Sequence, residues 1–96
     1  MNHKTKYILR EAQAGLRDKG DVVVRLKPAP DQSGIDIQIE SKVMSMYGDQ
    51  ICASVLETIE SNGLTDVHVS VQDQGALDYA IRARVQAAVD RAVREE

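Results

Sequence analysis

The change from strand to helix periodicity at Gly75, within residues 67–92, is the feature that most constrains the fold. Val67, Val69 and Val71 alternate with polar residues, which is the two-residue period of a strand with one buried face. After Gly75 apolar residues recur every three or four positions, as in an amphipathic helix: Leu77, Ile81, Val85, Ala88 and Ala92. A strand, a tight turn and a long helix therefore form one unit, and the rest of the chain has to cover its apolar sides.

Two further strand patterns lie earlier in the chain. Alternation of apolar and polar residues predicts strands over residues 22–27 and 35–40. Pro28 and Pro30 place a loop between them, because proline is excluded from the interior of a sheet. Since this connection is short, we expect the two strands to pair as an antiparallel hairpin.

A second helix pattern precedes Val67. Apolar residues spaced by four define one face of it: Val43, Tyr47, Ile51, Val55 and Ile59. Ser41 is a residue type favoured at a helix N-cap, and Asn62 with Gly63 marks the C-terminal end. Gly48 interrupts the run, so one kinked helix and two helical pieces are both compatible with the pattern. The predicted fold class is α+β: a small two-layer sandwich in the order strand-strand-helix-strand-helix, with both helices on one face of the sheet.

Residues 1–19 carry the weakest structural signal. Their apolar residues allow a short helix that Gly15 and Gly20 would interrupt, and their basic residues make this the basic end of an acidic chain. We expect a solvated, flexible lead-in, with a partner-binding arm as the alternative. Residues 20–96 are expected to form one domain, because a chain of 96 residues is long enough for a single modest core.

Composition narrows the classes of partner. Phe and Trp are absent and aromatic residues make up 3% of the chain, which argues against a base-stacking surface. The formal charge of −3 and the pI near 5.3 argue against nucleic acid or an anionic membrane as partner. Cys52 is the single cysteine, and no stretch resembles a signal peptide or a membrane span. We therefore expect a cytoplasmic protein.

The side chains that usually carry chemistry form no recognisable catalytic or metal-binding pattern. Cys52 lies on the apolar face of the first predicted helix and is expected to be a buried structural thiol. His68 points away from the valines of its strand and is expected to be a polar residue that faces solvent or lies under a helix, and His3 lies near the terminus. Neither a metal-ligand spacing nor a glycine-rich phosphate loop is present in the sequence. The residues thus predict a protein without a catalytic centre of its own.

One run of residues is specific enough to suggest a family. It reads Asp73-Gln74-Gly75-Ala76-Leu77-Asp78 and continues as Ile81-Arg82-Ala83-Arg84-Val85. Shorter matches precede it in unbroken order: Gly20-Asp21-Val22, Ile35-Asp36-Ile37-Gln38-Ile39, Tyr47-Gly48-Asp49 and Asp66-Val67. With these residues the chain from Gly20 onward resembles the acyl carrier (gamma) subunit of citrate lyase. The related acyl carrier of malonate decarboxylase is an alternative with a less close match.

This resemblance implies a non-catalytic carrier subunit. In the family, a serine holds a phosphoribosyl-dephospho-coenzyme A arm, and the thiol of the arm carries acetyl or citryl as a thioester. The implied partners are the alpha subunit, which exchanges acetyl for citrate, and the beta subunit, which cleaves the citryl thioester to oxaloacetate and acetyl-carrier. A transferase that attaches the arm is a third implied partner. Tethering would raise the effective concentration of the thioester at two active sites.

The position that carries the arm differs in this chain. The family segment reads roughly A-G-[ST]-L-E-S-[SG]-D, whereas residues 14–21 read A-G-L-R-D-K-G-D, so Lys19 stands where the modified serine is expected. A lysine amine cannot form the phosphodiester that a serine hydroxyl forms, and Thr5 and Ser33 carry hydroxyls outside the matching context. Three explanations stay open: a pseudo-carrier that has lost the arm, an altered sequence, or a moved attachment site. As an ordinary residue, Lys19 would be an exposed turn lysine.

Arg82 and Arg84 are the candidate partner-docking residues. Guanidinium groups suit phosphate and carboxylate, so these two side chains would bind the anionic arm or an acidic patch on a partner. The alternative is a solvated helix face on which they pair with Asp78 and Asp90.

Overall fold

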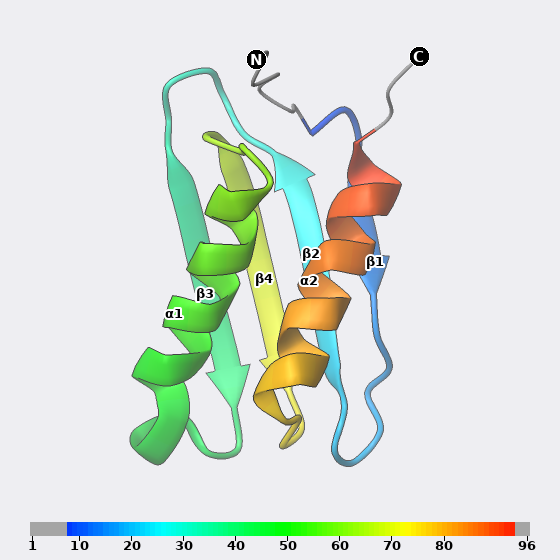
Figure 1. Cartoon of the computed structure of the whole chain (residues 1–96), viewed down its shortest axis with the longest axis vertical. Coiled ribbons are helices and arrows are strands. Elements are labelled where there is room, and N and C mark those ends of the chain that lie inside the picture. The colour runs from blue at the N-terminus through cyan, green and yellow to red at the C-terminus, as the bar shows by residue number, and fades with distance from the viewer. Residues whose placement is uncertain (1–7, 94–96) are drawn as a thin grey trace.

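The computed structural model describes residues 8–93, so His3 and Thr5 lie outside the described residues. Within this range the order is strand-strand-strand-helix-strand-helix (Figure 1). The elements are β1 (Ala12–Ala14), β2 (Val22–Pro28), β3 (Ile35–Ser41), α1 (Met44–Ser61), β4 (Val67–Asp73) and α2 (Asp78–Ala92). The predicted α+β class is confirmed, with one strand more than the sequence pattern indicated.

The extra strand lies in the N-terminal segment. Ala12–Ala14 pairs antiparallel with β2, and Ala14 is buried in the core. The short helix considered for this segment is therefore not formed among the described residues. Gly15 explains the turn back into β2, because its φ of 103° is one that a residue with a side chain rarely adopts. The sheet thus includes part of the segment that we expected to precede the domain.

The strand order is β1-β2-β4-β3, so the predicted antiparallel hairpin of β2 and β3 is wrong. β4 lies between these two strands, antiparallel to β2 and parallel to β3. A parallel pair requires a crossover connection, and α1 supplies it between β3 and β4. Burial explains why β4 takes the centre. Its valines are almost completely buried, whereas the isoleucines of β3 at the sheet edge are only half-buried.

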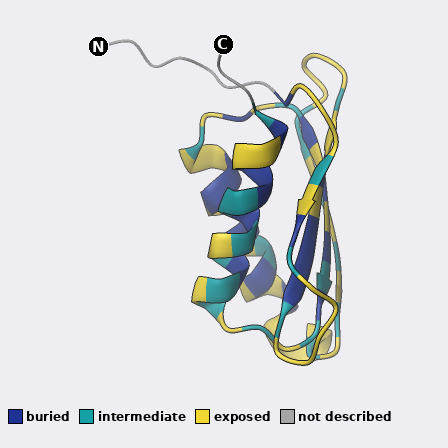
Figure 2. Cartoon of the chain, turned by 90° about the vertical axis from the view of Figure 1, so that its right-hand side faces the viewer, coloured by how far each residue is buried: buried dark blue, intermediate teal, exposed yellow. Residues whose placement is uncertain are grey.

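Both helices cover the same face of the sheet, as predicted (Figure 2). The core between the two layers consists of aliphatic side chains from β2, β4 and the inner faces of α1 and α2. The other face, which we call the open face, bears the side chains that alternate with the core residues. It comprises Gln13, Val23, Arg25, Lys27, Asp36, Gln38, Glu40, His68, Ser70 and Gln72.

The first helix differs in two details from the sequence pattern. α1 is one continuous helix through Gly48, whose lack of a side chain leaves room for Met44 one turn earlier. Ser41 is the last residue of β3, and the N-cap position is occupied by Val43 without a side-chain hydrogen bond. The Ser41 hydroxyl accepts from the Val43 N–H at 3.1 Å and donates to buried Asp73 at 2.7 Å. The N-cap prediction is therefore wrong, although Ser41 does fix the connection into α1.

The end of α1 agrees with the sequence pattern. Asn62 occupies the C-cap and Gly63 has a φ of 76°, as a C-terminal glycine should. Over residues 8–93, neither helix has the combination of length and hydropathy that crossing a lipid bilayer requires.

Candidate functional site

The turn that contains Lys19 lies at one end of the domain, beside the connection from β4 to α2. Lys19 is exposed in the turn that follows β1. The Gly20 N–H donates to the Gln74 carbonyl at 2.8 Å, and the Gln74 N–H donates to the Asp21 carbonyl at 2.9 Å. We call this end the turn end; it is formed by residues 15–21, 42–43 and 74–77, at the bottom of Figure 1.

Asp21 holds the turn in place. Its carboxylate accepts two hydrogen bonds from Arg84 of α2, at 3.1 and 2.8 Å, and it also accepts from the N–H groups of Val22 and Leu16. The hydrogen bond from Arg84 and then the one from Val22 lower the pKa of Asp21 below its usual value of 3.8. The turn is thereby fixed both to β2 and to the second helix.

An apolar pocket of about 370 Å³ opens at the turn end between the starts of the two helices. Its lining is Val43, Tyr47, Gln50, Ile51, Gly75, Ala76, Leu77, Asp78 and Ile81. Large hydrophobic side chains are also exposed in the first turns of both helices: Met46 is 74% exposed and Tyr79 is 72% exposed. Exposed apolar groups concentrated at one end suit contact with another molecule.

Leu77 is one of these exposed side chains, at 64% exposure, although its spacing placed it in the buried stripe of α2. That expectation is wrong because Leu77 is the N-cap residue with an extended backbone, so it stands outside the helical repeat. The stripe that does enter the core consists of Ile81, Val85, Ala88, Val89 and Ala92. Periodicity alone could not separate the first helical residue from the residue before it.

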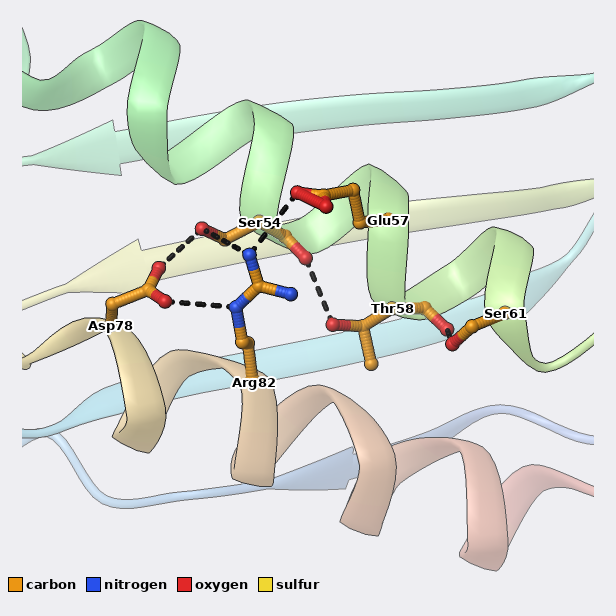
Figure 3. A network of polar contacts seen from close by, with 6 residues as sticks. All are labelled: Ser54, Glu57, Thr58, Ser61, Asp78 and Arg82. Atoms are coloured by element: carbon orange, nitrogen blue, oxygen red, sulfur yellow. Dashed lines mark hydrogen bonds and ion pairs between the residues drawn. The ribbon is translucent and has the colours of Figure 1, made fainter.

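Arg82 belongs to a polar network that connects the two helices (Figure 3). Its Nε donates to Asp78 at 2.8 Å, and its terminal nitrogen donates to Glu57 at 3.1 Å and to the Ser54 hydroxyl at 3.4 Å. The hydroxyl of buried Ser54 in turn donates to Asp78. Hydrogen bonds from Ser54 and then Arg82 lower the pKa of Asp78. Asp78 as a partner of Arg82 agrees with the ion pair expected from the sequence.

Arg84 has a different partner from the one expected. It binds Asp21 from the other end of the sequence, and Asp90 instead accepts from Gln86 at 3.0 Å. The side chains of Arg82 and Arg84 keep 41% and 38% of their surface exposed, so both guanidinium groups reach solvent while they hold their internal partners.

The remaining candidates are Cys52 and His68. Cys52 is only half-buried, so the expectation of a buried thiol is wrong, because it lies beside the buried stripe of Ile51, Val55 and Ile59 and not within it. His68 is exposed on the open face with its Nδ1 3.3 Å from Asp36. Across residues 8–93, His, Cys, Asp and Glu side chains form no group of three or more that could hold a metal ion. Sequence reasoning missed the pocket at the turn end, whose signal would have been the exposed apolar residues at both helix starts.

The turn does not supply the chemistry for a phosphodiester-linked group. Lys19 presents an amine, and the serine hydroxyl of Ser33 lies in the β2–β3 turn. The β2–β3 turn is hydrogen-bonded to the start of β4, through Gly34 and Val67. The Lys19 turn is hydrogen-bonded just beyond the end of β4, through Gly20 and Gln74. A seven-residue strand separates the two by roughly 20 Å. Ser33 therefore lies far from the position that corresponds to the family serine.

Comparison with known proteins decides the family. The family model described as ACP, malonate decarboxylase delta subunit (MdcD), matches residues 9–92. The citrate lyase acyl carrier protein of Halothermothrix orenii is 40% identical over 67 residues, which are 70% of this chain and 69% of that protein. That of Yersinia enterocolitica is 42% identical over 67 residues, or 70% and 68% of the two chains. The chain belongs to this acyl carrier protein family.

Members of this acyl carrier family are non-catalytic carrier subunits, so the chain is of a carrier type and not an enzyme. The same fold occurs in a solved structure, a Pseudomonas malonate decarboxylase hetero-tetramer in complex with malonate. The two chains superpose with a TM-score of 0.73 at 16% identity, over 91% of this chain and 88% of that chain. At this identity the likeness concerns the fold alone.

Proposed function

We propose that this chain is the acyl carrier (gamma) subunit of a citrate lyase-type complex in the cytoplasm. It would present acetyl and citryl thioesters on a phosphoribosyl-dephospho-coenzyme A arm to the alpha and beta subunits during cleavage of citrate to oxaloacetate and acetate. The observation that carries the proposal is the identity of about 40% to citrate lyase acyl carrier proteins, which extends over 70% of the chain.

The layout of the turn end supports a carrier role. A carrier needs an exposed attachment turn on a rigid body, with a docking surface close by, because tethering raises effective concentration only when the geometry allows both sites to be reached. The Lys19 turn is exposed, the Asp21–Arg84 interaction holds it to α2, and the apolar pocket lies at the same end. We propose Lys19 as the family attachment position and Arg82 and Arg84 as docking residues for an acidic partner.

The lysine itself favours a second candidate, a pseudo-carrier. Such a subunit would keep the docking surface and assemble with the complex without carrying the arm. The supporting observation is that Lys19 offers an amine where the family has a hydroxyl, while Ser33 lies at the opposite end of β4. Thr5 lies outside the described residues.

A malonate decarboxylase-type carrier is a further alternative. The description of the matching family model names that enzyme's delta subunit, whereas the relatives of about 40% identity are citrate lyase carriers. Co-purification with the subunits of one enzyme and not the other would separate the two assignments.

Intact mass spectrometry after co-expression with an arm-attaching transferase tests these proposals. An added mass on the natural chain, mapped to one peptide, supports the carrier and locates its site. A chain that stays unmodified but co-purifies with lyase alpha and beta subunits supports the pseudo-carrier. A chain that is neither modified nor bound contradicts both.

The Lys19→Ser variant sharpens the test. We expect it to gain the mass of the arm at residue 19, because the surrounding turn is exposed and held in place by Asp21. Asp18→Ser is the matched control, since it places a hydroxyl one residue away in the same exposed turn and is expected to stay unmodified. Equal modification of both variants would show that the transferase does not read this position.

A further inference from the structure

Among residues 8–93, no helix covers the open face of the sheet, and the charges of this face are separated across the sheet. Strand pairing aligns its side chains into rows that run from β2 through β4 to β3. The rows are Lys27–His68–Asp36, Arg25–Ser70–Gln38 and Val23–Gln72–Glu40. The β2 side therefore bears cations, the β3 side bears carboxylates, and β4 in the middle contributes no Lys, Arg or carboxylate.

Arg17 adds a cation at one end of the open face, beside the third row. It comes from the turn after β1 and lines one hollow with Val23, Ser70 and Gln72 and another with Glu40, Ser41 and Lys42 of the same copy. Among residues 8–93, no ion pair within 4.0 Å involves Arg17, Lys27 or Glu40. These charges are therefore available to a second molecule.

We propose that two copies of this chain associate through their open faces, related by a two-fold axis parallel to β4. A rotation about this axis places β2 of one copy over β3 of the other and preserves the position along the strand. Lys27 then lies over Asp36 of the second copy. Because the interface is isologous, this cross-pair occurs twice.

The axis itself brings no like charges together. Only β4 faces its own copy, through His68, Ser70 and Gln72, which carry no carboxylate, ammonium or guanidinium group. Arg25 is bound within its own copy to Gln13 at 2.9 Å and to Glu11 at 3.5 Å. In the proposed dimer it lies over the uncharged Gln38 of the second copy. The opposite orientation, with the axis perpendicular to the strands and parallel to the sheet, would place cations over cations. The charge pattern therefore selects one arrangement.

The shape and size of the face define what kind of association to expect. A hollow of about 410 Å³ lined by Arg25, Lys27, Asp36, Gln38, His68, Val69 and Ser70 gives room for side chains from the second copy. Strands spaced by about 4.8 Å make the three overlapping strands β2, β4 and β3 a face roughly 15 Å wide, which is small for a stable dimer. The association is consequently weak, and it depends on salt because its contacts are exposed ion pairs.

Sedimentation velocity over a concentration series tests the association. We expect the weight-average mass to rise from monomer toward dimer with concentration at low ionic strength, and this rise to be lost at about 0.5 M salt. A chain that stays monomeric at all concentrations at low ionic strength overturns the proposal. So does a dimer that is unaffected by salt.

Charge reversal identifies the face and the pairing. Lys27→Glu and Asp36→Lys are each expected to weaken association by about tenfold, because one substitution changes two symmetry-related contacts. The double variant Lys27→Glu with Asp36→Lys restores opposite charges in every cross-pair and is expected to regain most of the affinity. Circular dichroism checks that the variants are folded. We expect them to be, because Lys27 and Asp36 are exposed and do not contribute to the core.

Glu60→Lys is the matched control for Asp36→Lys. It makes the same change of charge at an exposed residue of α1, in the helix layer away from the open face, and is expected to leave association unchanged. If Glu60→Lys weakens association as much as Asp36→Lys does, the effect comes from net charge alone, and the assignment of the dimer interface to the open face is overturned. Failure of the double variant to regain affinity contradicts the Lys27–Asp36 pairing.

Discussion

Asp21 and Arg84 are 63 positions apart in the sequence and form two hydrogen bonds, of 3.1 and 2.8 Å. This interaction binds the turn that carries Lys19 to the middle of α2. Arginine presents two parallel donors to a carboxylate, which adds direction as well as affinity. The exposed Lys19 turn is therefore held in place by Arg84, a residue of the last helix.

Replacing Asp21 is expected to loosen this turn. Asp21→Ala removes the acceptor for Arg84 and for the N–H groups of Leu16 and Val22, so we expect the free energy of unfolding to fall by about 1–2 kcal/mol. Urea denaturation measures the fall, and hydrogen exchange should show faster exchange at the amides of residues 16 and 22. The control Asp31→Ala changes an exposed turn carboxylate and is expected to stay within about 0.5 kcal/mol of the natural chain. Equal losses from both variants would contradict the role of Asp21.

The free energy of unfolding is expected to decrease as the pH is lowered below about 5. The pKa values of Asp21, Asp66 and Asp78 are all lowered, by Arg84, by the Gly34 N–H and by the Ser54 hydroxyl respectively. A lowered carboxyl pKa stabilises the fold fully above the unfolded pKa, and this contribution is lost as pH falls through the lower folded pKa. The free energy of unfolding, measured by urea titration at each pH, should decrease accordingly. Asp21→Asn should make that decrease shallower, and an unchanged slope would show that Asp21 does not contribute.

The network between α1 and α2 is expected to act as a unit. Ser54 is buried and donates to Asp78, and Arg82 donates to both, so removing either side chain breaks the Ser54–Asp78 hydrogen bond and one contact of Arg82. We expect a double-mutant cycle of Ser54→Ala and Asp78→Ala to give a coupling energy of about 1 kcal/mol. A parallel cycle of Ser54→Ala and Asp90→Ala is the control, since Asp90 binds Gln86 and not Ser54. Its coupling should lie within about 0.3 kcal/mol of zero. Similar coupling in both cycles would contradict a specific network.

Periodicity predicted the individual elements better than their arrangement. The strands over β2, β3 and β4 and both helices follow from local spacing of apolar residues, and so does the placement of both helices on one face. The sheet order does not follow from it, because local spacing does not report which strand has two neighbours. Complete burial of Val67, Val69 and Val71 requires the central position, and a hairpin of β2 and β3 would have left β4 at an edge. The three-residue strand β1 is too short to show an alternation.

The candidate site was predictable in part for a similar reason. An i, i+4 spacing predicts the Arg82–Asp78 pair, because the two residues share a helix face. The Arg84–Asp21 pair depends on the packing of α2 against the turn before β2, which no local pattern contains. The pocket at the turn end likewise forms where the starts of two helices meet. The pairing of rows on the open face became visible only when the strand register was known.

Gly15 and Gly20, which flank the Lys19 turn, are expected to respond differently to the same substitution. Both have a positive φ, of 103° and 81°, so an alanine at either position costs about 1 kcal/mol in backbone strain. A Cβ at Gly15 would also lie 1.8 Å from the Val22 carbonyl oxygen, whereas a Cβ at Gly20 meets nothing within 4 Å. We therefore expect Gly15→Ala to lower the free energy of unfolding by clearly more than Gly20→Ala, because only Gly15→Ala forces β1 away from β2. Urea denaturation of the two variants compares them directly, and equal losses would show that the turn relaxes without moving the strand.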